Sequence, residues 1–272
     1  MKVIKVIVTV LLLFVVTLLC ILIWLVRPIT VSEDDINILS PQYLIAHGGG
    51  GIDGKTYTNC KEALISSLDK GFRYVELDLY MTSDSDVVCL HHISDFNMMT
   101  SSHYDSLDQK TFLESQFYGK YTPMSLEDAI KIWEERPFIF VTDKISDPQV
   151  LNRYFKKHRE RVFVEAFSID DYWQLEKDGY TPMFSIMAMN VRGLARYLKA
   201  SFKSRKMIKR IVTNSDVSKY TLRIFKRLGV EMTAIYSLDD EDYWRKHEKS
   251  YLEKYIGREV DLVYTDYLTP RE

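Results

Sequence analysis

The chain has 272 residues, 27% of them charged, and its formal net charge at pH 7 is −2. This length fits a single α/β domain of about 240 residues preceded by an N-terminal segment. Because basic residues are not in excess, we expect no nucleic-acid partner, and the three cysteines are too few for a disulfide framework.

The N-terminal segment is typical of a membrane anchor. Residues 6–26 are apolar apart from Thr9 and Thr17, and about twenty such residues span a bilayer as a helix. Lys2 and Lys5 precede this run, and basic residues favour the cytoplasmic side. We therefore predict a single-pass signal anchor in the cell membrane, with the N-terminus cytoplasmic. A cleaved signal peptide is the alternative, but the run is long for one and lacks a small-x-small cleavage site.

The chain then divides into a cytoplasmic N-terminus (residues 1–5), the transmembrane anchor (6–26), a tether (27–40) and an extracytoplasmic barrel domain (41–272). A tether this short would keep the active site close to the membrane surface. The basic segment 199–210 is predicted to be a solvated helix face, with binding of anionic headgroups or polymer as the alternative.

Three short apolar runs in residues 43–92 each end beside titratable side chains. They are 43–46 before His47, the strand that carries Glu76 and Asp78, and 87–90 before His91 and His92. Because side chains alternate along a strand, the two carboxylates share one face, where they repel each other unless a cation separates them or the face is wet. Such oxygen ligands suit Mg²⁺ or Ca²⁺ rather than zinc. Active sites of parallel barrels form at the carboxyl ends of the strands, so we expect these groups to meet.

After these runs, strands and helices alternate, which predicts a parallel sheet closed into a barrel. Strands are predicted at 138–143, 161–167, 183–187, 211–213, 231–236 and 261–265. Helices are predicted at 59–70, from a cap at Thr122 or Ser125 to about 135, and at 148–158, 170–178, 191–202, 217–228 and 239–255. With the three runs above, nine candidate strands compete for eight barrel positions. One unit near the start is therefore irregular, or one strand lies outside the barrel.

Residues 93–121 are polar and show little periodicity, so we expect a long functional or mobile loop there. The strand at 138–143 ends in the adjacent pair Asp143 and Lys144. In a regular strand these two side chains would point in opposite directions, whereas a local bend would bring both to one side. Glu165, on the next strand, is a further candidate for an inward carboxylate, with a salt-bridged barrel residue as the alternative.

These motifs resemble, in order and spacing, those of the glycerophosphodiester phosphodiesterase family. The matching segments are Ala46-His47-Gly48-Gly49, Thr58-Asn59-Cys60, Glu76-Leu77-Asp78, and residues 87–92, 138–144, 234–239 and 263–267. The chain departs from the family pattern at Gly48, Thr58 and His92, which stand in place of a phosphate-binding Arg, a Glu and an Asp. It looks closer to a branch that has glycine after the histidine and a Tyr-Thr-Asn turn.

The resemblance implies a TIM (β/α)8 barrel of the PLC-like phosphodiesterase type that holds one divalent cation, Ca²⁺ or Mg²⁺. The implied roles are metal binding by Glu76, Asp78 and Asp143, acid–base catalysis by His47 and His91, and substrate binding by Lys144, Asn59 and Tyr236. Imidazole suits acid–base work because its pKa lies near working pH. Tyr236 stands where the family has a Trp at the barrel mouth, and would form a wall for a glycerol or sugar group.

The implied function is metal-dependent cleavage of glycerophosphodiesters or related phospholipid or envelope phosphodiesters. The three substitutions motivate an alternative, a catalytically weak or inactive barrel that binds phosphodiester-containing lipids or envelope polymers. A third possibility is a lyase that leaves a cyclic phosphate product.

Overall fold

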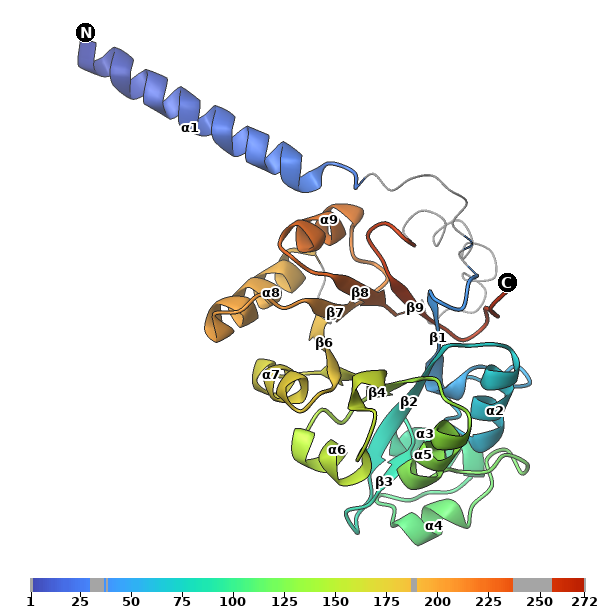
Figure 1. The fold of residues 1–272 in the computed structure, drawn as a ribbon. Helices are drawn as coiled ribbons and strands as arrows, with labels where there is room; N and C mark the ends of the chain where they lie inside the picture. The colour runs from blue at the N-terminus through green and yellow to red at the C-terminus, as the bar shows by residue number, and fades with distance from the viewer. Residues whose placement is uncertain (1, 30–36, 38, 187–189, 237–255, 272) are drawn as a thin grey trace.

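The computed structural model describes residues 2–29, 37, 39–186, 190–236 and 256–271. Within these residues, eight parallel strands close into a barrel (Figure 1). In ring order they are β1 (Leu44–Ala46), β9 (Leu262–Thr265), β8 (Met232–Ile235), β7 (Arg210–Thr213), β6 (Thr181–Ile186), β5 (Val162–Ala166), β4 (Ile139–Asp143) and β2 (Tyr74–Met81). Since β1 also pairs with β2, the ring has no open edge, and the predicted TIM barrel is confirmed.

Helices cover the outside of the ring between successive strands. They are α2 (Lys61–Asp69), α5 (Leu126–Glu135), α6 (Pro148–Tyr154), α7 (Ile169–Lys177), α8 (Asn190–Ser204) and α9 (Lys219–Arg227), with short 3-10 turns η1 (His47–Gly49) and η2 (Arg159–Arg161). Of the two predicted caps of α5, Ser125 is the cap, because its hydroxyl accepts the Asp128 N–H at 3.1 Å. The largest difference from the predicted bounds is at α6, which ends at residue 154 instead of 158. The predicted helix 239–255 lies outside the described residues.

Apolar side chains fill the interior of the barrel, so it is a packed core and not a pore. This inner cluster comprises Ile45, Val141, Met183, Val212, Ala234, Leu262 and Tyr264, all of them buried. A larger apolar cluster lies between the outer face of the strands and the surrounding helices.

The additional strand β3 (Val87–Cys89) lies outside the ring and pairs antiparallel with the far end of β2. The prediction that one of the nine candidate strands is not in the barrel is therefore confirmed. The expectation that His91 follows a parallel barrel strand is wrong, because β3 runs back toward the barrel. Its last hydrogen bond, from the Leu90 N–H to the Asp78 carbonyl at 3.0 Å, brings the following residues level with Asp78.

Residues 93–121, expected to be a long loop, instead contain two helices, α3 (Ile93–Thr100) and α4 (Gln109–Leu113), so this prediction was wrong. Phe96, Phe112 and Phe117 are fully buried and pack against one another, with ring centroids separated by 5.7, 5.8 and 6.1 Å. The sequence lacks a helical period here because the three aromatic rings of this small core come from α3, α4 and the segment after α4, and not from one face of a single helix.

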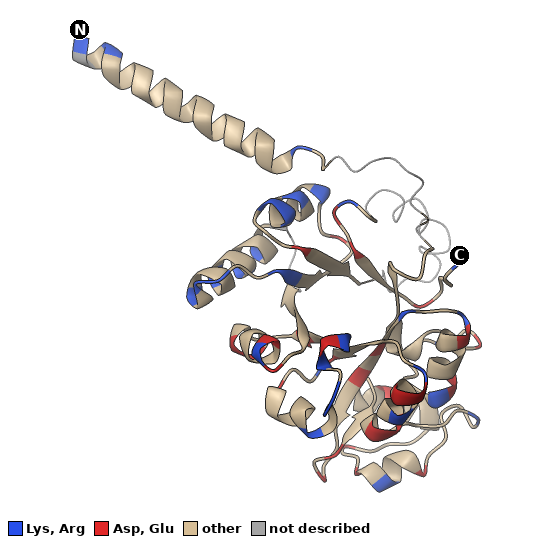
Figure 2. Ribbon diagram, in the orientation of Figure 1, with Lys and Arg blue, Asp and Glu red and all other residues tan. Residues whose placement is uncertain are grey.

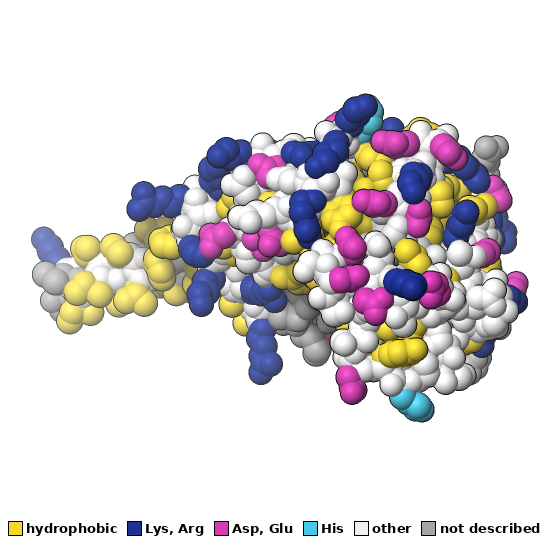
Figure 3. Space-filling view, turned by 90° about the horizontal axis from the view of Figure 1, so that it is seen from below, with side chains coloured by type: hydrophobic (Ala, Val, Ile, Leu, Met, Phe, Trp, Pro, Cys, Tyr) yellow, Lys and Arg dark blue, Asp and Glu magenta, His cyan; other side chains and the backbone are white. Residues whose placement is uncertain are grey.

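The N-terminal helix α1 (Lys2–Val26) projects from the body of the molecule, and Figure 3 shows its apolar surface uncovered. Its segment Ile4–Val26 is the one helix in the described part of the chain that is long and apolar enough to cross a membrane. The end of α1 contacts α9. Arg223 Nη1 donates to the carbonyl of Val26 at 3.1 Å, and the Arg227 guanidinium lies 4.8 Å from the centroid of the Trp24 ring.

We expect Phe96→Ala to lower the free energy of unfolding by about 3 kcal/mol, because removing a buried ring leaves a cavity among its neighbours. Denaturant unfolding of the full-length protein in detergent measures this change. The matched control is Met98→Ala on the same helix, where the side chain is 63% exposed and the expected change is below about 0.5 kcal/mol. Equally small effects of both substitutions would contradict a packed second core.

Candidate active site

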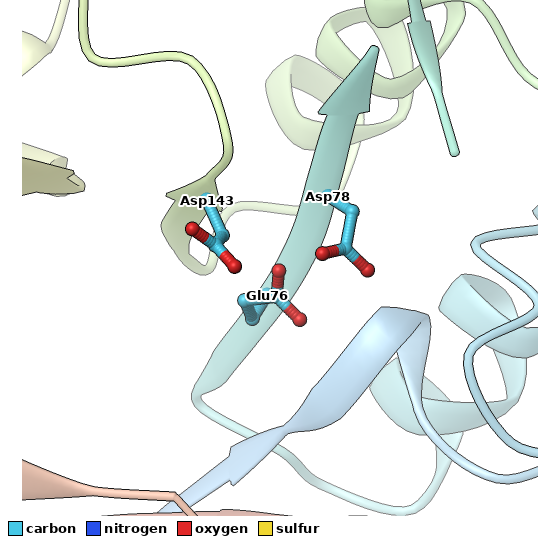
Figure 4. A group of neighbouring side chains, drawn as sticks. All are labelled: Glu76, Asp78 and Asp143. Atoms are coloured by element: carbon cyan, nitrogen blue, oxygen red, sulfur yellow. The ribbon is translucent and has the colours of Figure 1, made fainter. Parts of the chain in front are cut away.

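Three carboxylates meet at the carboxyl end of two neighbouring barrel strands (Figure 4). Glu76 and Asp78 lie on the same face of β2, and Asp143 at the end of β4 is paired in register with Asp78. One oxygen from each carboxylate lies within 4.8 Å of the others, and all three residues are buried. The sequence-predicted metal-binding residues are therefore together in space.

The environment of these carboxylates disfavours their charged forms. Burial raises the pKa of Glu76 well above its ordinary value, and the neighbouring Asp78 and Asp143 raise it further. Burial and Asp143 likewise raise the pKa of Asp78, although His47, Asn59 and His91 oppose this. Glu76 Oε2 accepts the Gly48 N–H at 2.7 Å, whereas its buried Oε1 has no hydrogen-bond partner among the described residues. A divalent cation would give Glu76 Oε1 a partner and would offset the repulsion among the three carboxylates. The donor set therefore fits Mg²⁺ or Ca²⁺.

Lys144 reaches the same cluster through a bend at the end of β4. Its φ of 67° lies in the left-handed region, and its Nζ lies 3.2 Å from Asp143 Oδ2 and 3.8 Å from Asp78 Oδ1. Partial burial lowers the pKa of Lys144, but Asp143 and Asp78 outweigh this effect and the net shift is upward. The local bend that the sequence left open thus puts the adjacent Asp143 and Lys144 on one side.

Asn59 is fully buried and pairs with Asp78 through both atoms of its amide. Its Nδ2 donates to Asp78 Oδ2 at 2.9 Å, and its Oδ1 accepts the Asp78 N–H, also at 2.9 Å. These two bonds fix the orientation of the Asp78 carboxylate. The predicted substrate contact of Asn59 stays a prediction, since the geometry assigns both amide atoms to Asp78.

His47, at the end of β1, is buried beside Asp266, which follows β9. Its Nδ1 lies 3.4 Å from Asp266 Oδ1. Burial alone lowers the pKa of His47, but the Asp266 carboxylate, helped by Asp78 and Asp143, raises it more, so the net shift is upward from the ordinary value of 6.5. Folding therefore shifts the protonation equilibrium of His47 toward the charged imidazole.

His91 and His47 share one neighbour, the ring of Tyr57. The centroid of the Tyr57 ring is 4.4 Å from the centroid of the His47 ring and 5.3 Å from that of His91. His91 Nδ1 is 2.7 Å from Asp95 Oδ2. Each histidine therefore has a carboxylate at Nδ1. The charges of both rings lower the pKa of Asp78.

Tyr236, at the end of β8, contacts the carboxylate cluster. Its hydroxyl donates to Glu165 and lies 3.4 Å from Asp143 Oδ2, and its ring stacks on Tyr264 with centroids 4.4 Å apart. Burial, followed by the charge of Asp143, raises the pKa of Glu165 to about 8. Glu165 thus points into the barrel as the sequence suggested, but its hydrogen-bond partner is a tyrosine and not a basic residue.

Sequence reasoning gave no role to Asp266, Asp95 or Tyr57. Asp266 could have been found from its place directly after the last strand, where barrel active-site residues lie. Asp95 could have been found from its spacing of four residues from His91. Tyr57 carried no comparable signal, because its place between the histidines depends on the course of the 51–58 turn.

No protein-family model matches the sequence, and no curated protein sequence is significantly similar to it. Solved structures do match. A glycerophosphoryl diester phosphodiesterase from Parabacteroides distasonis is 17% identical with a TM-score of 0.62, and the match covers 90% of this chain and 87% of that one. An Oleispira antarctica phosphodiesterase, solved in complex with the product sn-glycerol-3-phosphate, is 14% identical with a TM-score of 0.59, covering 83% and 93%. A glycerophosphodiester phosphodiesterase from Agrobacterium tumefaciens is 13% identical with a TM-score of 0.56, covering 83% and 96%. The chain therefore has the barrel fold found in these enzymes.

We expect Asp266→Asn to lower the pKa of His47. Burial lowers this pKa, and the substitution removes the Asp266 carboxylate that raises it. NMR titration of the His47 ring protons in EDTA-treated protein measures this shift. The stability that the pairing adds is fully present below the unfolded pKa of about 6.5 and is lost as the pH rises through the raised folded value.

The control is Asp170→Asn, which removes an exposed carboxylate that pairs with Lys203 at 2.8 Å. This substitution should leave the His47 titration unchanged. An unchanged His47 pKa in Asp266→Asn would show that Asp266 does not raise the pKa of this ring.

Proposed function

We propose that this protein is a membrane-anchored, metal-dependent phosphodiesterase that cleaves glycerophosphodiesters or related phospholipid or envelope phosphodiesters. The observation that carries the proposal is the meeting of three buried carboxylates with two carboxylate-paired histidines at one end of the barrel. The similar fold of the Oleispira antarctica phosphodiesterase, which was solved in complex with its product sn-glycerol-3-phosphate, supports a glycerol phosphate group in the substrate.

Glu76, Asp78 and Asp143 would hold the cation, for which Mg²⁺ or Ca²⁺ is our proposal because both prefer oxygen ligands. When bound, the cation would neutralise the phosphate and lower the pKa of a hydroxyl coordinated to it. Asn59 keeps Asp78 in the ligating orientation. We assign to Lys144, whose ammonium lies beside the cluster, a contact with a phosphate oxygen.

The two histidines would move the protons of the reaction. Asp266 and Asp95 face Nδ1 of His47 and His91, so Nε2 of each ring is the atom placed to exchange a proton with the substrate. One ring would accept a proton from the attacking hydroxyl while the other protonates the leaving alcohol. Tyr236 would close one wall of the space above the cluster, next to a glycerol or sugar group.

The direct test is turnover of a glycerophosphodiester panel by the full-length protein in detergent, after EDTA treatment and with Ca²⁺ or Mg²⁺ restored. We expect turnover only with a cation, and a fall in kcat of about 10²-fold to 10⁴-fold in His47→Gln and His91→Gln, as for loss of a general acid or base. The matched control is His103→Gln, an exposed histidine near His91 in sequence, which should keep wild-type turnover.

Two outcomes would redirect this proposal. Turnover that survives EDTA would remove the metal from the mechanism. Tight binding of phosphodiesters without turnover would favour the alternative, a barrel that only binds these compounds. Phosphorus NMR of the products distinguishes a hydrolase from a lyase, because only the lyase releases a cyclic phosphate as its final product.

The membrane anchor is the second part of the proposal. We propose that α1 spans the cell membrane with its N-terminus in the cytoplasm, since it is apolar, exposed and preceded by basic residues. Figure 2 shows Lys and Arg positions along α9, which the end of α1 contacts, and along the neighbouring α8.

In bacterial expression, we expect the protein to resist alkaline extraction from membranes and a C-terminal tag to be digested by protease added to spheroplasts. Leu12→Arg should reduce membrane insertion, because an arginine near the middle of a span costs about 2.5–3.5 kcal/mol. The control is Leu198→Arg on α8, outside the span and 44% exposed. A mature protein shortened at its N-terminus in mass spectrometry would identify α1 as a cleaved signal peptide instead.

A further inference from the structure

A pocket of about 480 Å³ lies beside His91. Its walls include Lys55, Tyr57, His91, Asp95, Met98 and Tyr118. It shares His91 and Tyr57 with the candidate active site, whereas none of the three clustered carboxylates lines it. The pocket therefore borders the candidate active site at His91 and Tyr57.

The turn that forms one wall of this pocket also excludes a side chain at position 48. Gly48 has a φ of 54°, and a Cβ added to it would lie 2.7 Å from the Cα of Tyr57, closer than real contacts allow. The backbone of Tyr57 therefore occupies the room that a longer residue 48 would need. The chain cannot carry a basic side chain at position 48 without moving this turn, so a second cation for an anionic substrate has to come from elsewhere.

Lys55 supplies a positive charge in the pocket itself. The turn is held by reciprocal hydrogen bonds between the backbones of Ile52 and Lys55, at 2.9 and 2.8 Å. The Lys55 ammonium lies 4.7 Å from the centroid of the Tyr118 ring, and within the described residues no carboxylate forms an ion pair with it. The one acidic side chain among the lining residues, Asp95, already pairs with His91. The pocket therefore offers a cation that has no ion-pair partner among the described residues, together with aromatic and methionine surface.

We propose that this pocket receives the leaving alcohol of the phosphodiester, and that Lys55 selects alcohols that carry a second anionic group such as a phosphate monoester. This inference rests on the proposed phosphodiesterase function and names its substrate class. An anionic group gains a charge-assisted contact with Lys55, whereas a quaternary ammonium group faces a like charge there. The tyrosine rings and Met98 contact the carbon skeleton of the alcohol.

The test compares two substrates that differ by one phosphate, glycerophosphoinositol and glycerophosphoinositol 4-phosphate, with full-length protein in detergent. We expect wild-type kcat/KM to be about tenfold higher for the phosphorylated substrate, and this preference to weaken as salt is raised. Lys55→Met should remove the preference while leaving cleavage of glycerophosphoinositol within about twofold, and Lys55→Arg should retain it.

The matched control is Lys120→Met. Lys120 also lies over a tyrosine ring, 4.6 Å from the centroid of Tyr121, but it pairs with Asp53 and does not line the pocket. It should leave the preference intact. An equal loss on both substrates in Lys55→Met, or a wild-type preference for glycerophosphocholine, would overturn the proposal.

Calorimetric binding of the same two compounds to His47→Gln protein distinguishes failure of the pocket from failure of the enzyme. Tighter binding of the phosphorylated compound that depends on Lys55, without turnover by the wild type, would support the pocket and refute the phosphodiesterase. Turnover without any Lys55-dependent preference, in binding or in cleavage, would refute the pocket and leave the phosphodiesterase standing.

Discussion

The repulsion among three buried carboxylates is the constraint on which the rest of this site depends. Their oxygens lie within 4.8 Å of one another, in surroundings where burial already raises the pKa of Glu76 and of Asp78. Backbone and side-chain donors and a lysine ammonium are arranged around them. They are the Gly48 N–H, the Asn59 amide, the Tyr236 hydroxyl and Lys144 Nζ. In the described part of the chain, Glu76 Oε1 still lacks a hydrogen-bond partner, and a divalent cation is the group that would satisfy it.

Left-handed backbone conformations bring several of these donors to the cluster. Gly48, Tyr57, Asn59 and Lys144 have φ values of 54°, 55°, 50° and 67°. For residues other than glycine this conformation costs free energy and persists where surrounding contacts fix it. Here the contacts are those of the site itself: Asn59 with Asp78, Lys144 with Asp143, and Tyr57 between two imidazole rings.

The packing of the segment 93–121 positions His91, one of the two candidate catalytic histidines. The helix α3 begins two residues after His91, and its first turn supplies Asp95 to the imidazole Nδ1. The next residue, Phe96, is buried in the second aromatic core. That core therefore holds His91 in place from outside the barrel, while β3 returns the chain to the level of Asp78. A histidine on a free loop would lack this support.

The sequence alone determined the features that follow from local periodicity. Alternation along a strand put Glu76 and Asp78 on one face, alternating strands and helices predicted the barrel, and the run 6–26 predicted an apolar helix. The tertiary structure alone decided which distant residues meet: Asp143 opposite Asp78, Asp266 behind His47, and the antiparallel course of β3. It also decided the bend that turns Lys144 toward Asp143 and the approach of Tyr57 to Gly48. The physical reason is that side-chain direction is set by neighbours in sequence, whereas strand register and left-handed turns are fixed by contacts between residues far apart in the chain.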